Sequence, residues 1–114
     1  MEPNTEEKTT ATLPNKQQID AWKKKYPTGV HQLTAKHPVD KTEHSAIIRQ
    51  PGMVDVQRAM ASEKQRVGTF NESIFSNCEL FCDPLIKSTD SLMMGIYGQL
   101  GDLIEIAEVT VKKL

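Results

Sequence analysis

The fold of this chain is decided by residues 30–49, which read VHQLTAKHPVDKTEHSAIIR. The first part of this stretch alternates imperfectly between apolar and polar residues, and the second part contains Ala-Ile-Ile at 46–48, a β-prone run. Pro-Val-Asp at 38–40 has the composition of a turn. The pattern therefore predicts two antiparallel strands, roughly residues 29–36 and 43–50, that form a β-hairpin.

Helical patterns flank the hairpin on both sides. One helix is predicted before it, over residues 16–26, with Asn15 as its N-cap. Three helices are predicted after it, over residues 53–65, 70–81 and 90–113, because apolar residues recur there at helical spacing. The apolar residues of the four predicted buried faces are Ile19, Trp22, Tyr26, Met53, Val56, Ala59, Met60, Phe70, Ile74, Cys78, Phe81, Leu92, Ile96, Leu100, Leu103, Ala107, Val111 and Leu114. The predicted fold is therefore α+β: an N-terminal helix, a two-stranded antiparallel β-hairpin and then three helices.

The N-terminal residues differ in composition from the rest of the chain. Residues 1–14 hold two prolines, four threonines and three glutamates, and almost nothing apolar. Such a segment buries too little apolar surface to offset its ordering entropy, so a flexible polar arm is expected. The arm is either a free solubilising tail or a segment that orders against a partner. Residues 15–114 have the length of a single α+β domain.

The overall composition excludes several functional classes. The chain has 114 residues and a net charge of −1, without the basic stripe that a nucleic-acid-binding protein normally carries. No apolar run approaches the roughly 20 residues that span a bilayer, so no membrane partner is expected. The first residues are acidic and lack the apolar core of a secretory signal, which predicts a cytoplasmic location.

The sequence contains no recognisable catalytic or cofactor-binding motif. It lacks a glycine-rich phosphate loop and the HExxH metalloprotease pattern. Cys78 and Cys82 are spaced i, i+4, which on a helix would place both on one face. The single metal-binding set that can be assembled combines them with His37 and His44, whose separation is too wide for the usual zinc pair. We therefore expect no metal, no cofactor and no enzymatic activity.

The last predicted helix has an unusual glycine pattern. Gly95, Gly98 and Gly101 recur at three-residue intervals, and each costs about 1 kcal/mol relative to alanine inside a helix. They indicate close packing within the fold, a bend or break, or a groove for a partner helix. Methionines at 93 and 94 suit a surface that accepts varied partners, or they fill the core. The residues predicted to contact a partner are Phe75, Met93, Met94, Gly95, Gly98, Gly101 and Ile106.

Several stretches together resemble small proteins of tailed phages and prophages of gut Bacteroidales. They are QQIDAWKKKY at 17–26, IRQP at 48–51 before the helix that carries Ala59, FNE through NC at 70–78, and GQLG through KKL at 98–114. A strand, Arg-x-Pro and a helix, followed later by Asn-Cys in a helical bundle, also resemble phage tail assembly chaperones.

This resemblance implies a small cytosolic α+β protein that has no catalytic residues. It implies a role in holding the tape-measure protein while the tail tube polymerises, in the host cytoplasm during assembly. The alternative is a structural component of the phage particle, such as a decoration, adaptor or ring protein, whose N-terminal arm orders against a neighbour. The expected partners are other phage proteins, tape-measure or virion components, and further copies of the chain.

Overall fold

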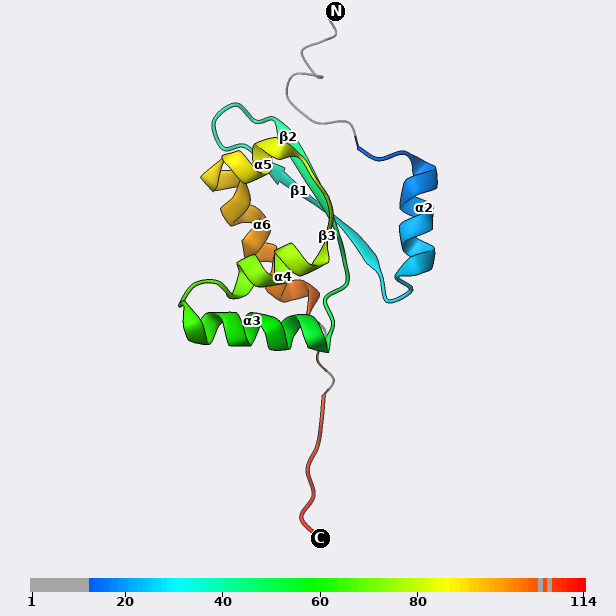
Figure 1. The fold of residues 1–114 in the computed structure, drawn as a ribbon, viewed down its shortest axis with the longest axis vertical. Coiled ribbons are helices and arrows are strands. Elements are labelled where there is room, and N and C mark those ends of the chain that lie inside the picture. The colour runs from blue at the N-terminus through cyan, green and yellow to red at the C-terminus, as the bar shows by residue number, and fades with distance from the viewer. Residues whose placement is uncertain (1–12, 105, 107) are drawn as a thin grey trace, which may run out of the picture.

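The computed structural model describes residues 13–104, 106 and 108–114, and these form an α+β fold (Figure 1). Most of the predicted N-terminal arm lies outside the described residues. The elements in chain order are α2 (Lys16–Lys25), β1 (Val30–Lys36), β2 (Glu43–Arg49), α3 (Met53–Gln65), α4 (Phe70–Cys78), β3 (Glu79–Cys82), α5 (Pro84–Ser88) and α6 (Asp90–Leu103). The predicted helix–hairpin–helix order is confirmed, and a third strand and a short fifth helix are added.

The predicted hairpin forms two neighbouring strands of a three-stranded sheet. β1 and β2 pair antiparallel over their full lengths, from Val30 opposite Arg49 to Lys36 opposite Glu43. β3 pairs antiparallel with the other side of β2, so the strand order is β1-β2-β3 in the described part of the chain. β1 is consequently an edge strand, with one row of backbone groups directed away from β2.

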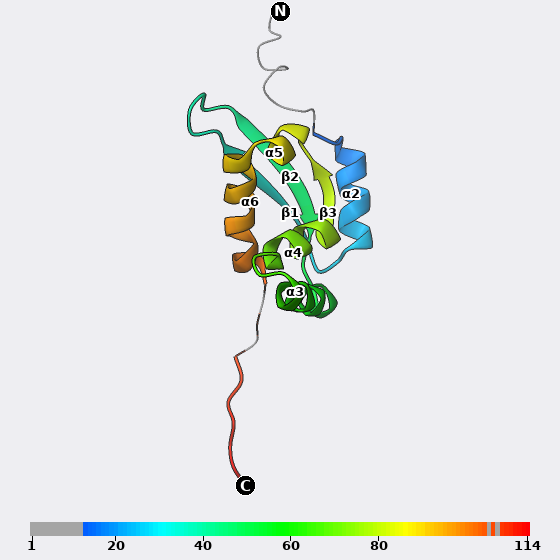
Figure 2. The ribbon, with the colours of Figure 1, turned by 60° about the vertical axis from the view of Figure 1, so that its left-hand side comes forward.

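The sheet separates two unequal layers. Figure 2 shows α6 on one side of the strands and α2 on the other, with α3 and α4 at the lower end. Ala46 and Ile48 of β2 are fully buried in the main core, together with Ile74 of α4, Ile86 of α5 and Leu100 of α6. Burial of each large aliphatic side chain stabilises the fold by roughly 1.5–3 kcal/mol, so this layer supplies most of the stability.

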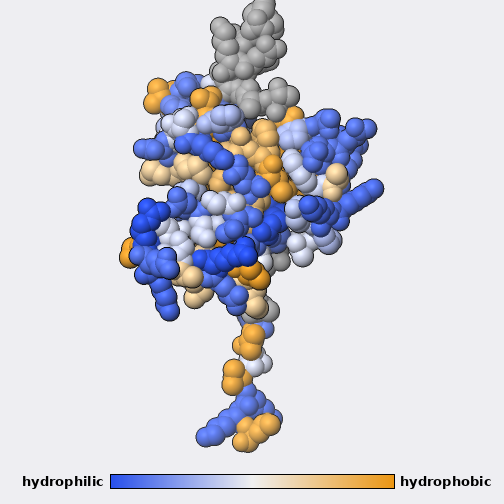
Figure 3. All heavy atoms as spheres, viewed as in Figure 1, coloured by the Kyte–Doolittle hydropathy of each residue, from blue (hydrophilic) through white to orange (hydrophobic). Residues whose placement is uncertain are grey.

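The layer formed by α2 is thinner. Asn15 caps this helix as predicted, because its side chain accepts a hydrogen bond of 2.8 Å from the backbone of Gln18. Its predicted apolar face is only half-buried, and no residue of α2 is fully buried. Figure 3 shows hydrophilic side chains covering α2 and apolar residues gathered between it and the rest of the body.

The helix predicted over residues 70–81 is shorter in the structure. It ends at Cys78, and the chain then enters β3, where Phe81 lies opposite Ile47. The remaining edge of β2 offers hydrogen bonds to this segment, and this long-range pairing replaces the local helical pattern. The segment after β3 contains α5, which is capped by the Asp83 side chain through a 3.0 Å bond from Leu85 N–H.

The predicted buried stripe of the helix at 53–65 is also partly wrong. Met53 and Met60 are exposed, whereas Ala59 and the charged Asp55 are buried. Asp55 must face Arg49 and the backbone of Gly52, and this orients the helix. At about 100° per residue, both methionines then lie on the outer face.

The last helix is shorter than predicted. α6 ends at Leu103, and Ile104 already has an extended backbone with φ −78° and ψ 116°. Val111 and Leu114, expected on a buried helical face, are almost fully exposed, and Ala107 lies outside the described residues. The core ends with α6, so tertiary contacts no longer stabilise a helix in a segment rich in β-branched residues.

Candidate functional site

The outer face of α6 brings together four of the residues predicted to contact a partner. Met94, Gly98 and Gly101 are spaced i, i+4, i+7, and Gly95 lies beside them on the same exposed side. The Met94 side chain is 70% exposed. We call Met94, Gly95, Gly98 and Gly101 the Met–Gly face.

The structure bears on two of the three explanations for the glycines. A Cβ atom built on Gly95, Gly98 or Gly101 meets nothing within 4 Å, so close packing within the fold is wrong. α6 continues through all three glycines, so no break lies inside the stripe, but the helix ends at Leu103, two residues after Gly101. The groove for a partner helix stays a prediction.

The other predicted contact residues are placed differently. Phe75 is 3% exposed and packs edge-on against Tyr97, with ring centroids 6.3 Å apart, so the expectation that it lies on the surface is wrong. α4 contacts β2, α3 and α6, and few of its positions can face solvent. Met93 is half-buried against the core. Ile106 is exposed, but it lies beyond the end of α6 and apart from the Met–Gly face.

A groove runs between the edge strand β1 and α6. It holds about 380 Å³ and is lined by residues 32–36 of β1 and by Ser91, Gly95, Ile96 and Gln99 of α6. We call it the edge groove. Sequence reasoning missed this groove, although the strand itself was predicted. The small residues Ala35 and Gly95 are the feature of the sequence that leaves room for the groove. Only the fold reveals that both line it.

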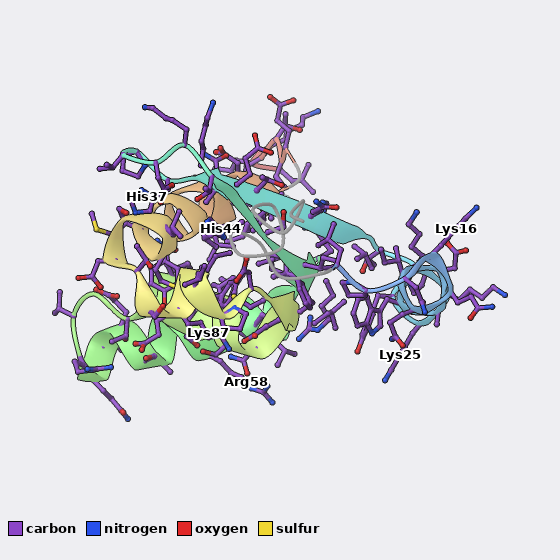
Figure 4. The ribbon with its side chains drawn as sticks, turned by 90° about the horizontal axis from the view of Figure 1, so that it is seen from above. Lys16, Lys25, His37, His44, Arg58 and Lys87 are labelled. Carbon is purple, nitrogen blue, oxygen red and sulfur yellow. The ribbon has the colours of Figure 1, made fainter. Side chains whose placement is uncertain are left out.

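A compact polar cluster lies at the hairpin end of the sheet, where Figure 4 labels His37 and His44. The His44 side chain is 3% exposed; its Nδ1 lies 2.9 Å from Asp83 Oδ2 and its Nε2 lies 2.7 Å from Thr42 Oγ1. Thr42, His44 and Asp83 supply a hydroxyl, an imidazole and a carboxylate in the same order as in a nucleophilic triad. A pocket of about 200 Å³ borders the cluster.

The hydrogen-bond directions argue against a nucleophile in this cluster. Thr42 Oγ1 donates to Asp40 Oδ1 over 2.7 Å, and the bonds from the Thr42 backbone and hydroxyl lower the pKa of that carboxyl group. His44 Nε2 lies 2.7 Å from the same Thr42 oxygen and Nδ1 lies 2.9 Å from Asp83 Oδ2, and the tautomer decides which ring nitrogen donates. A hydroxyl activated by a base must instead direct its proton to the imidazole. The cluster ties the turn, β2 and the start of α5 together.

The two cysteines are not poised for reaction or metal binding. Cys78 ends α4 and Cys82 belongs to β3, so they do not share a helical face. Burial raises the pKa of each thiol to about 11, which keeps both protonated at neutral pH. Within residues 13–104, 106 and 108–114, no group of three or more histidine, cysteine or carboxylate side chains is arranged to hold a metal ion.

A bidentate ion pair joins the end of β2 to the start of α3. Arg49 Nη1 and Nη2 each lie 2.8 Å from a different oxygen of the Asp55 carboxylate, which also accepts the Gly52 N–H over 2.8 Å. Arg49 donates further to the Asn77 carbonyl at 2.9 Å. These hydrogen bonds, with Arg49 first, lower the pKa of Asp55 to about 2. Both Nη atoms of Arg49 bond inside the fold, so the pair has a structural role.

Replacing Gly98 by alanine is expected to raise the free energy of unfolding by up to about 1 kcal/mol, because open space surrounds the added methyl group. Urea denaturation measures the change. The matched control is Gly68→Ala, which also has open space but sits at φ +92° and should lose stability. A loss of stability in the Gly98 variant would show that the α6 glycines are required by the fold itself.

Comparisons with protein-family models, curated proteins and solved structures found no match to this chain. In the part of the chain that the structure describes, none of the helices has the length and apolar character needed to cross a membrane.

Proposed function

We propose that this chain is a non-catalytic assembly factor of a tailed phage that holds an apolar client segment on the Met–Gly face. The observation that carries the proposal is an exposed helix face with three glycines and a methionine that no part of the described fold covers. The sequence resemblance to tail assembly chaperones supplies the setting, with the tape-measure protein as client in the host cytoplasm.

The energetics of α6 support a binding role. Three glycines within seven residues cost the helix roughly 2–3 kcal/mol relative to alanine. Nothing within the described fold approaches them, so their small size does not serve internal packing. A glycine-lined face lets a partner backbone come close, and the flexible Met94 adapts to clients of different shape.

The polar clusters support the non-catalytic part of the proposal. The Thr42 hydroxyl donates a hydrogen bond of 2.7 Å to Asp40 Oδ1. Cys78 and Cys82 carry raised thiol pKa values. The residue types that catalyse group transfer are present, but each is engaged in an arrangement that stabilises the fold.

Client binding is tested by purifying the tagged chain from infected cells and measuring the co-purified tape-measure protein by mass spectrometry. Met94→Glu should reduce the captured amount about tenfold, because a buried methionine contact is replaced by a charge. Met53→Glu is the matched control, since Met53 is 76% exposed on α3, away from the Met–Gly face. Equal capture by both variants would exclude this face as the client site.

A structural component of the particle is the second candidate. The exposed apolar residues after α6, Ile106, Val109 and Val111, favour it because such a segment can order on a neighbouring subunit. Mass spectrometry of purified particles separates the two roles. Stoichiometric copies in the mature virion would exclude the chaperone role, whereas absence from virions together with capture of the tape-measure protein would exclude the structural role.

A further inference from the structure

The segment after α6 has the character of a β-strand without a sheet. Residues 109–112 read Val-Thr-Val-Lys, which alternates apolar and polar residues and contains three β-branched side chains. Val109 and Val111 are 76% and 91% exposed. Figure 3 shows apolar side chains along the C-terminal strip of chain, which stands clear of the body. Such a strand gains hydrogen bonds and apolar burial by joining a sheet edge.

The fold offers one long edge of that kind. β1 extends over Val30–Lys36 and has β2 on one side, and no strand covers its other side within the described residues. Leu33 and Ala35 are half-buried and contact the core, whereas Gln32 and Thr34 face solvent. The edge groove lies beside this strand, and Gly95 leaves room in it for an added strand.

We propose that residues 108–112 of a second copy of this chain add to β1 as an antiparallel strand. In the proposed register Val109 lies opposite Ala35 and Val111 lies opposite Leu33, so both valines enter the edge groove. Thr110 then pairs with Thr34 on the solvent side of the sheet. Opposed side chains of this kind stabilise an antiparallel pair.

The charges agree with this register. It places Glu108 opposite Lys36, at the end of β1 where the hairpin turn begins. It also places Lys112 opposite the uncharged Gln32. No like charges meet within the five proposed pairs.

The length of the chain between Leu103 and Glu108 favours strand pairing between two copies over strand pairing within one chain. Gln50 donates a side-chain hydrogen bond to the Leu103 carbonyl and a backbone bond of 2.9 Å to the Gly29 carbonyl, so α6 ends beside the start of β1. Glu108 must reach Lys36 at the far end, about 20 Å along the strand. The five residues after Leu103 span at most about 17 Å. The antiparallel register therefore favours pairing with another copy.

This inference goes beyond the proposed function, because self-association through β1 needs no client. It uses the edge groove, which shares Gly95 with the Met–Gly face, whereas client capture is tested at Met94, which does not line the groove. Val111→Lys should weaken self-association about tenfold, measured by analytical ultracentrifugation, and leave capture of the tape-measure protein unchanged. Met94→Glu should have the opposite pattern, so failure of one proposal is separable from failure of the other.

Cross-linking tests the register directly. In the full chain carrying Cys82→Ser, one sample receives Thr34→Cys and another Thr110→Cys, and the two are mixed under mild oxidation. A disulfide-linked heterodimer is expected, because directly opposed Cβ atoms lie about 4.5–5.5 Å apart. The control replaces Thr34→Cys by Ser45→Cys; Ser45 Oγ lies 3.0 Å from Thr34 Oγ1 on the same face but one strand further from the edge. The control mixture should give no heterodimer.

Groove filling provides an independent measurement. Gly95→Arg places a long side chain in the edge groove and should abolish self-association, whereas Gly98→Arg, on the same helix but outside the groove, should not. The proposal is overturned if the cysteines cross-link only within a doubly substituted chain, which means that the segment folds back on itself. It is also overturned if no cross-link forms, or if both arginine variants associate like the parent chain.

Discussion

Replacing Asp55 by alanine is expected to lower the free energy of unfolding by about 3 kcal/mol. The variant leaves the Arg49 side chain, which is 24% exposed, without the Asp55 carboxylate, and removal of one partner of a largely buried pair has about this cost. It also removes the acceptor for the Gly52 N–H at the start of α3. Urea denaturation followed by circular dichroism measures the change, provided that the m-value stays constant.

An exposed pair serves as the control for this prediction. Arg66 and Glu72 lie 3.2 Å apart with side chains 75% and 51% exposed. Glu72→Ala should therefore change stability by less than about 0.5 kcal/mol. Equal losses in the two variants would show that burial of the Arg49–Asp55 pair does not determine its contribution.

The same pair predicts an acid-sensitive part of the stability profile. The Asp55 pKa is lowered from 3.8 to about 2, chiefly by the Arg49 hydrogen bonds. The folded state thus binds its proton less readily than the unfolded state, and the stabilisation is complete above about pH 4. It is lost as the pH falls from about 4 to about 2. Asp55→Asn should flatten this part of the profile.

Replacing His44 by alanine is the second large effect, also expected to cost about 3 kcal/mol. The substitution removes the 2.9 Å hydrogen bond between the imidazole and the Asp83 carboxylate, which is only 4% exposed, and it opens a cavity beside the core. Chemical denaturation of both proteins at pH 7 gives the difference.

His37→Ala is the matched control for His44. The His37 imidazole accepts a backbone bond of 3.1 Å from Val39 in the exposed turn, which contributes about 1 kcal/mol or less. A loss as large as that of His44→Ala would indicate that the turn, and not the buried pair with Asp83, limits stability.

The parts of the fold that were predicted correctly are those with a local cause. The hairpin followed from the β-prone run at 46–48 and the turn at 38–40, and the first helix followed from its Asn15 cap. Each of these sequence patterns spans only a few residues. The local structure that it predicts therefore does not depend on which other elements pack against it.

The sequence identified unusual residues of the candidate site but not their surroundings in the fold. Gly95, Gly98 and Gly101 were recognised as unusual, but their meaning depended on what surrounds them in space. Phe75 was predicted to be exposed because it lies off the apolar face of its helix. The structure buries it, because α4 has neighbours on several sides.

The amino-acid sequence by itself determined the α+β class, the hairpin and the glycine stripe, since these depend on backbone preferences and on side-chain period. Tertiary structure alone decided that residues 79–82 join the sheet and that α6 stops at Leu103. A short apolar segment takes the conformation that its long-range partner stabilises, and β2 offered an edge to β3. The segment after Leu103 has no such partner within the described chain, and this is the physical reason to look for one on a second copy.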